Sequence, residues 1–304
     1  MGGGLAQVDT VAAMRVAMAQ ISSTDDPTAN LATLRSATEE AASRGAELVV
    51  FPEATMCRFG VPLKPVAEDI DGPWARGVSE VAAASGVTVV AGMFTPSGDG
   101  RVRNTLVVAH PDETRLEYHK IHLYDAFGFT ESKNVAPGSE PLTFEVGGVT
   151  VGVATCYDIR FPGLFTHLAR LGAQVIVVPT SWGAGPGKLR QWEVLAAARA
   201  LDSTTFVVAV DQAVPTDDEA ASSSAPTGIG HSQITDPFGT LVAAYPDSIR
   251  VDVHDLDLAL VEKARTQLAV LANERPLPVG GGTDNDVTPA HARLRESDDP
   301  GRNP

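Results

Sequence analysis

The chain has few cysteines and no segment typical of export. Only Cys57 and Cys156 carry a thiol among its 304 residues, which is too few for the disulfide framework of a small secreted domain. The opening residues MGGGLAQVDTVAAM lack the basic region, the apolar core and the cleavage site of a signal peptide. Ala6 breaks the pattern for N-myristoylation. We therefore expect a cytoplasmic protein in a reducing compartment.

Long apolar runs and an excess of positive charge are also absent. No stretch approaches the ~20 apolar residues that a membrane-spanning helix needs. Lysine and arginine total 23 against 38 aspartates and glutamates, so the net charge is -15. Such a charge repels phosphate backbones and anionic lipid surfaces. The sequence therefore predicts no membrane and no nucleic-acid partner. We interpret the acidity as a source of solubility rather than as a means of steering a cationic substrate.

The sequence gives little support for a nucleotide or metal cofactor. No GxGxxG motif occurs, and the GAGPGK segment at 183–188 departs from a phosphate loop. Trp182 stands where that loop needs its first glycine, and Leu189 where it needs a hydroxyl. His119 and His122 have no further ligand at a suitable spacing. We therefore expect neither a cofactor nor a metal site.

The sequence does contain short apolar runs, rich in β-branched residues, that alternate with longer amphipathic stretches. This pattern predicts strands separated by helices. Pro27 is typical of a helix start, and Gly45 and Gly86 of helix ends. In the first half the pattern predicts strands within 14–21, 46–55 and 87–95, helices within 30–45 and 74–86, and an antiparallel pair within 101–120.

The same order recurs in the second half, so we expect two similar halves around one core. Here the pattern predicts strands within 149–156, 173–182 and 204–212, helices within 162–172 and 188–203, two strands within 230–246, and a strand and a helix within 248–268. We assign a flexible extension to residues 1–13, one α/β domain to 14–278 and an acidic, disordered tail to 279–304. The small, polar segment 215–228 is either a lid or, as we prefer, a plain surface connection.

Three side chains able to do chemistry each follow a predicted strand. Glu53 ends the run LVVFPE, Lys120 ends a β-like segment, and Cys156 ends VTVGVATC. A carboxylate buried at a strand end would have a raised pKa, which suits a general base. A lysine there could hold an oxyanion, and a cysteine could be a nucleophile. Each residue also has a structural interpretation, as an ion-pair partner, an exposed lysine or an inert core cysteine.

Taken in order, the three motifs resemble those of the carbon-nitrogen hydrolases, the nitrilase and amidase superfamily. The chain is similar to that family in LVVFPEAT, YHKIHLYD and GVATCYDIRFP, and in two later blocks, over roughly residues 14–276. The resemblance implies a four-layer α-β-β-α sandwich with two mixed sheets. It implies a homodimer or a higher homo-oligomer, in which a helix within 162–172 meets its copy across the dimer axis.

The resemblance also implies a role for each residue. Cys156 would be the nucleophile, Glu53 the general base and later the acid, and Lys120 the group that stabilises the tetrahedral intermediate. The backbone N–H of Tyr157 would assist Lys120, and Glu131 would correspond to a second family glutamate that orients the substrate or the lysine. The reaction implied is hydrolysis of a small amide, through a thioester, to ammonia or an amine and a carboxylic acid.

CYDIRFP resembles the omega-amidase and deaminated-glutathione amidase branch. Gly163 departs from that branch, which often has glutamate there. Arg58, Arg160 and Arg190 are candidates to neutralise a substrate carboxylate, and Ser181 and Trp182 belong to a loop expected to shape the pocket. Three other reactions remain as alternatives: N-carbamoyl hydrolysis, nitrile hydrolysis and acyl transfer. A further alternative is a non-catalytic protein that binds a metabolite or partner.

Overall fold

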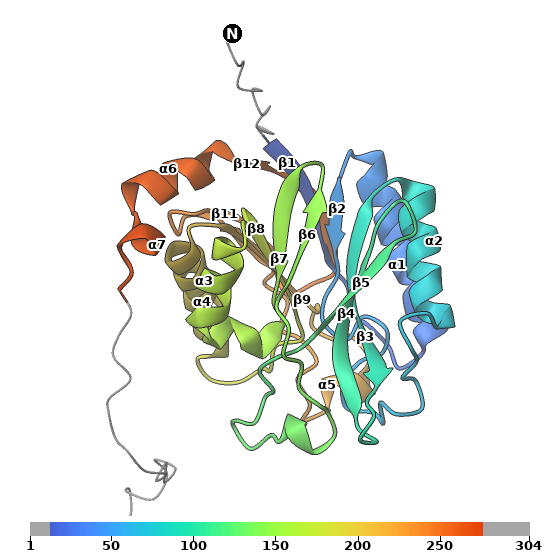
Figure 1. Cartoon of the computed structure of the whole chain (residues 1–304). Coiled ribbons are helices and arrows are strands. Elements are labelled where there is room, and N and C mark those ends of the chain that lie inside the picture. The colour runs from blue at the N-terminus through green and yellow to red at the C-terminus, as the bar shows by residue number, and fades with distance from the viewer. Residues whose placement is uncertain (1–12, 276–304) are drawn as a thin grey trace, which may run out of the picture. The chain divides into compact units, whose positions relative to one another are not determined.

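The computed structural model describes residues 13–275, which form two six-stranded mixed sheets with helices on their outer faces (Figure 1). The first sheet runs in the order β12 (Arg250–Asp257), β1 (Ala13–Gln20), β2 (Leu48–Val50), β3 (Thr88–Pro96), β4 (Val102–Ala109) and β5 (Arg115–His119). The second runs in the order β11 (Leu241–Ala244), β10 (Gln233–Thr235), β9 (Phe206–Asp211), β8 (Val175–Thr180), β7 (Val149–Val153) and β6 (Leu142–Val146).

The two sheets have the same internal plan. In the first, β1, β2 and β3 are parallel, and in the second, β7, β8 and β9 are parallel. The remaining pairs in both sheets are antiparallel. The helices are α1 (Pro27–Ser43), α2 (Pro73–Ser85), α3 (Pro162–Arg170), α4 (Lys188–Ser203), α5 (Asp218–Ala221), α6 (Ala259–Gln267) and α7 (Val270–Asn273). The expected recurrence of one plan in two halves is confirmed.

Three apolar layers hold the sandwich together. The central layer lies between the sheets and joins side chains such as Val16 and Leu106 to Val151 and Val208. A second layer packs α1 and α2 on the first sheet, and a third packs α3 and α4 on the second. Figure 1 shows these helix pairs on opposite outer sides. Burial of apolar surface on both faces of each sheet explains why their central strands are continuous apolar runs, and the predicted four-layer fold is confirmed.

The helix signals act as their chemistry requires. The carboxylate of Asp26 accepts hydrogen bonds from the N–H groups of Thr28 and Ala29, at 2.8 and 3.3 Å, ahead of Pro27. Gly86 ends α2 in the left-handed region at φ +68°, which glycine adopts at little cost. Helix α1 therefore begins, and helix α2 ends, where the sequence indicates.

Three features differ from, or go beyond, the sequence interpretation. Strand β6 was not predicted; a Gly147–Gly148 turn with φ +57° and +83° joins it to β7. The segment 215–228 is not a plain connection, because it contains α5 and its end reaches a pocket described below. Strand β12 crosses to the first sheet and pairs with β1.

The proposed extension and tail fall almost wholly outside the described residues. Ala13, the last residue assigned to the extension, instead opens β1. The chain divides into one compact unit that ends at Asn273 and a second unit, Glu274–Pro304. Only the first two residues of the second unit are described. No helix within 13–275 is both long and apolar enough to cross a membrane.

Candidate active site

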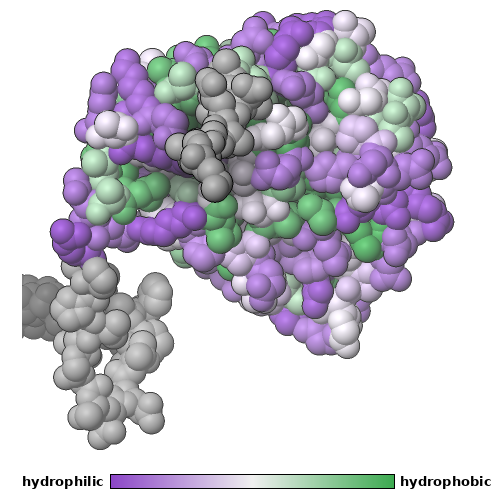
Figure 2. Space-filling model, turned by 45° about the horizontal axis from the view of Figure 1, so that its top comes forward, coloured by the Kyte–Doolittle hydropathy of each residue, from purple (hydrophilic) through white to green (hydrophobic). Residues whose placement is uncertain are grey.

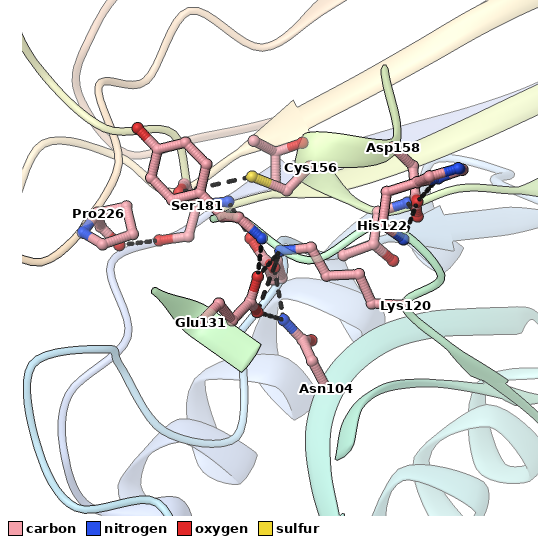
Figure 3. A network of polar contacts seen from close by, with 12 residues as sticks. Asn104, Lys120, His122, Glu131, Cys156, Asp158, Ser181 and Pro226 are labelled. Carbon is pink, nitrogen blue, oxygen red and sulfur yellow. Dashed lines mark hydrogen bonds and ion pairs between the residues drawn. The ribbon is translucent and has the colours of Figure 1, made fainter. Parts of the chain in front are cut away.

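The structure brings the three predicted catalytic side chains to one pocket. Glu53 follows β2 and Lys120 follows β5 of the first sheet, whereas Cys156 follows β7 of the second. All three line a pocket of about 580 Å³, and Figure 3 shows Lys120 and Cys156 with the polar contacts around them. The strand ends of two sheets therefore supply a single site, as ligand sites at strand carboxyl ends commonly do.

Glu53 is the most tightly held member of the site. Its side chain is 1% exposed, and its Oε1 lies 2.9 Å from the Nζ of Lys120. The Nδ2 of Asn104 donates to the same oxygen at 2.7 Å, and the backbone N–H of Ser181 donates to Oε2 at 2.9 Å. Three donors from three separate elements thus fix the orientation of this carboxylate.

Glu131 lies on the other side of Lys120, within the short 3-10 helix η1 (Glu131–Lys133). Its Oε2 is 3.0 Å from the Nζ of Lys120 and accepts the backbone N–H of Tyr124 at 2.6 Å. Asn104 donates to its Oε1 at 3.2 Å. Lys120 and Asn104 therefore bridge both glutamates, which places Glu131 where an orienting residue would have to lie.

Cys156 opens a second short 3-10 helix, η2 (Cys156–Arg160), directly after β7. Its backbone has φ +45°, a left-handed conformation that a non-glycine residue adopts at a cost and that recurs where a turn presents a nucleophile. The thiol lies 3.9 Å from the carbonyl oxygen of Ser181, and the residue is 8% exposed. The turn thus points a nearly dry thiol into the pocket.

The charges of the cluster set the protonation states. Burial raises the pKa of Glu53, an effect that Lys120 opposes and Glu131 reinforces. Burial also raises the pKa of Cys156 well above its usual range, and the charge of Glu53 adds to that effect. Burial would lower the pKa of Lys120, but the carboxylates of Glu131 and Glu53 outweigh it and raise that pKa. At neutral pH the thiol therefore needs a base, and Glu53 is the adjacent one.

Other residues that the sequence interpretation placed around the catalytic three lie at the pocket. Tyr157, Arg160, Ser181 and Trp182 all line the pocket. Ser181 also has a supporting contact that the sequence did not indicate, because its hydroxyl donates to the carbonyl of Pro226 at 2.7 Å, in the segment 215–228.

Of the three candidate arginines, only Arg160 lines the pocket. Arg58 is not a lining residue, although its guanidinium donates at 3.4 Å to the carbonyl of Phe59, which does line the pocket. Arg190 has a side chain that is 77% exposed on α4 and pairs with Glu193 at 3.5 Å. Arg58 and Arg190 therefore do not line the pocket themselves, and the spacing of arginines along a chain does not reveal which way each side chain points.

The sequence interpretation missed Asn104, Tyr124 and Lys188. Asn104 lies within β4 and is 1% exposed, so its position as an amide inside an apolar run was an available signal. Tyr124 and Lys188 line the pocket, and the Nζ of Lys188 donates to the hydroxyl of Tyr124 at 3.1 Å. No local pattern distinguishes Lys188 from an ordinary lysine at a helix start.

The two histidines weighed as metal ligands contact other groups. The Nδ1 of His119 lies 3.0 Å from the hydroxyl of Thr105, and the Nδ1 of His122 lies 2.7 Å from the carboxylate of Asp158. Across residues 13–275 no group of three His, Cys, Asp or Glu side chains is arranged to hold a metal ion.

A four-layer sandwich that brings a glutamate, a lysine and a cysteine into one buried pocket has the architecture of a nitrilase-type hydrolase. Residues 15–266 match the model of the carbon-nitrogen hydrolase family, and the chain belongs to that family. It is accordingly a hydrolase of carbon-nitrogen bonds in amides other than peptides.

Named relatives support the same assignment. The chain is 57% identical over 267 residues to a protein of Mycobacterium tuberculosis named only as a hydrolase, covering 86% of this chain and 95% of that one. It is 36% identical to the deaminated glutathione amidase of Escherichia coli O157:H7, covering 79% and 88%. It is 35% identical to the omega-amidase of Xenopus tropicalis, covering 78% and 86%.

A solved structure agrees with the fold. Nit3 of Saccharomyces cerevisiae, a member of branch 10 of the nitrilase superfamily, superposes with a TM-score of 0.74 at 25% identity, covering 86% of this chain and 96% of that one. The resemblance to the nitrilase superfamily and to its omega-amidase and deaminated-glutathione amidase branch is confirmed.

Proposed function

We propose that this protein hydrolyses the terminal amide of a small, carboxylate-bearing molecule through a thioester on Cys156. The observation that carries the proposal is the contact of 2.9 Å between Lys120 and Glu53 in a pocket that also holds the Cys156 thiol. A buried base, a buried cation and a nucleophile in one pocket are what acyl transfer to a thiol requires.

The proposed reaction has two halves. Glu53 takes the thiol proton, and the sulfur of Cys156 attacks the amide carbon. Lys120 and the backbone N–H of Tyr157 hold the developing oxyanion. Ammonia leaves with the proton from Glu53, and a thioester remains. Glu53 then takes a proton from water, whose oxygen attacks the thioester carbon. The C–S bond breaks, Glu53 returns the proton to the sulfur, and a carboxylic acid is released from the regenerated thiol.

Two cations support an anionic end on the substrate. Arg160 and Lys188 both line the pocket, and their side-chain hydrogen bonds among the described residues go to neutral groups, the amide oxygen of Gln191 at 2.7 Å and the hydroxyl of Tyr124 at 3.1 Å. The Cζ of Arg160 and the Nζ of Lys188 lie 5.6 and 3.5 Å from the centroid of the same Phe127 ring, and burial together with the charge of Arg160 lowers the pKa of Lys188. A substrate carboxylate between them would relieve the repulsion between the two positive charges and satisfy both.

The relatives named as amidases support an amide rather than a nitrile as the scissile group. The pocket volume of about 580 Å³ suits a small metabolite. The nucleophile is a free thiol, and both cysteines are unpaired among the described residues. The proposal therefore includes a small-molecule partner and a reducing, cytoplasmic location.

The decisive experiment measures ammonia released from a panel of omega-amides of dicarboxylic acids, N-carbamoyl acids and nitriles. We expect turnover of the omega-amides, and its loss in Cys156→Ala and in Glu53→Gln with unchanged circular dichroism. Cys57→Ala is the matched control because burial raises the pKa of this second thiol to about 11, and it lies outside the pocket lining. Undiminished turnover in both active-site variants would refute the mechanism, and transfer to added hydroxylamine without hydrolysis would identify an acyltransferase instead.

A further inference from the structure

A fully buried carboxylate outside the catalytic cluster connects the two segments that carry Lys120 and Cys156. Asp158 is 0% exposed and belongs to η2, two residues after the nucleophile. Tyr118 lies two residues before Lys120, and His122 two residues after it. The first segment ends β5 of the first sheet, and the second follows β7 of the other sheet.

Four donors converge on this carboxylate. The hydroxyl of Tyr118 donates to Oδ2 of Asp158 at 2.7 Å, and the backbone N–H of Thr155 donates to the same oxygen at 2.9 Å. The backbone N–H and the Nδ1 of His122 lie 2.9 and 2.7 Å from Oδ1. We refer to Tyr118, His122, Thr155 and Asp158 as the Asp158 tie, and Figure 3 shows Asp158 and His122 facing each other beside Lys120 and Cys156.

The tie is packed against other side chains on both sides. Tyr118 is 1% exposed and packs in the central layer between the sheets. The ring of His122 stacks on Phe161, with centroids 3.7 Å apart and planes 7° apart. A carboxylate removed from water needs all its donors, so the position of Asp158 fixes the backbone on both sides of Lys120.

We propose that Asp158 is a positioning residue, which through Tyr118 and His122 holds the ammonium of Lys120 at its working distance from the Cys156 sulfur. This positioning role rests on the catalytic roles proposed above for Lys120 and Cys156. Lys120 comes from one sheet and Cys156 from the other, and apolar packing between sheets has no directional preference. Hydrogen bonds to a charged acceptor are directional and strong, so they define the distance that packing leaves loose.

The first test is steady-state turnover of the best omega-amide. Because a displacement of ~1 Å at a reacting centre costs on the order of 100-fold in rate, Asp158→Asn is expected to lower kcat by about 100-fold with little change in KM. Tyr118→Phe removes one donor and is expected to give a smaller loss. Tyr245→Phe is the matched control, because its buried hydroxyl contacts Met18, Asp252 and His254 away from the pocket.

A rescue pair keeps the test valid if Asp158→Asn does not fold. His122→Leu removes the ring donor to Asp158, whereas His122→Asn keeps an N–H near the position of Nδ1. We expect the asparagine variant to retain most of the kcat that the leucine variant loses. Equal losses in both, or a loss confined to KM, would overturn the proposal.

The second test separates positioning from a general loss of structure. The alkylation rate of Cys156 by iodoacetamide, read on its own peptide by mass spectrometry, is compared in a double-mutant cycle of Asp158→Asn and Lys120→Met. If the tie acts through Lys120, Asp158→Asn changes the rate in the native background and has little effect once Lys120 is gone. Independent effects in the two backgrounds would overturn the proposal. Alkylation needs no amide hydrolysis, so failure of the positioning proposal can be told apart from failure of the proposed function. Failure of the proposed function would instead appear as continued ammonia release by Cys156→Ala.

Discussion

Two carboxylates share one ammonium group in the nearly dry centre of the site. With Glu53, Glu131 and Lys120 all charged, one negative charge is left without a partner. This excess is the electrostatic reason that Glu131 raises the pKa of Glu53. A carboxylate that accepts a proton more readily than usual is a stronger base toward a thiol, so at the residue scale the surplus charge serves the first step of the proposed reaction.

The same cluster predicts how activity depends on pH. The proposed base works only when ionised, so kcat/KM should fall as pH drops through the raised pKa of Glu53. Glu131→Gln removes a charge that raises this pKa, so the acid limb of the kcat/KM profile should move to lower pH even though the maximum rate is reduced. The profile of the variant, set beside that of the exposed control Glu140→Gln, measures the shift. An acid limb that stays in place or moves to higher pH would contradict this account.

Lys188 gives a second prediction at this scale. If its ammonium binds a substrate carboxylate, Lys188→Met loses a hydrogen bond to a charged group worth about 1.5–3 kcal/mol, which corresponds to a rise of about 10- to 150-fold in KM. A neutral primary amide should show no such rise, so comparison of KM for the two substrates is the measurement. Lys263→Met is a matched control because that ammonium also lies near an aromatic ring, that of Phe238, but outside the pocket lining. An equal effect on both substrates would remove the anionic end from the proposal.

At the scale of elements, Glu53 depends on a glycine in the neighbouring strand. A Cβ on Gly92 of β3 would lie 2.4 Å from the backbone nitrogen of Ala54 and 2.9 Å from the carbonyl carbon of Glu53. The backbone beyond β2 also bonds to this glycine, since the N–H of Met56 donates to its carbonyl at 2.8 Å. The close approach of the two chains therefore positions the proposed base.

Gly92→Ala is accordingly expected to displace residues 53 and 54 and to lower kcat by on the order of 100-fold, because small shifts of a reacting group are costly. Gly163→Ala is the matched control: its Cβ would meet nothing within 4 Å, and alanine favours the helix α3 in which it lies. We expect Gly163→Ala to keep its turnover, and its melting temperature to stay the same or rise. If the folded Gly92→Ala protein keeps the native kcat, then catalysis does not depend on the exact position of Glu53 and the prediction is wrong.

The elements also show how far the sequence leads. Alternating apolar runs located the central strands and the helices because burial on both faces leaves a direct record in composition. The ends of these apolar runs are visible in the sequence, so the reactive side chains that follow them, Glu53, Lys120 and Cys156, could be located as well. Pairing between distant segments leaves no such record, so neither the place of β12 beside β1 nor the contact of Asn104 with Glu53 was predicted.

At the scale of the whole molecule, the site exists only where two sheets meet. Glu53 and Lys120 follow strands of one sheet and Cys156 follows a strand of the other. The backbone N–H of Ser181, just after β8 of the second sheet, donates to Glu53 at 2.9 Å. Of the outer helices, α4 contributes its first residue, Lys188, to the pocket lining. On the face in Figure 2, hydrophobic residues occur in groups interrupted by hydrophilic ones, so that face shows scattered apolar surface rather than one broad patch.

The outer face of α4 leads to the last prediction, which concerns assembly. Val194 and Leu201 are 44% and 39% exposed and lie seven residues apart, so they share one helix face. Leu171, at the end of neighbouring α3, is 49% exposed. We expect this face to be the contact of a homodimer, since burial against a second copy would remove these side chains from water.

Sedimentation should then give the mass of two chains for the native protein. The double variant Val194→Glu and Leu201→Glu should have the mass of one chain, because charges placed in an apolar contact must be desolvated without partners. Ile249→Glu is the stricter control: this residue is 60% exposed, more than either helix residue, but lies outside the helices, just before β12. Its variant should remain dimeric. A double variant that still sediments as a dimer would place the contact elsewhere, and a native monomer would show that α4 keeps these apolar side chains exposed without a partner copy.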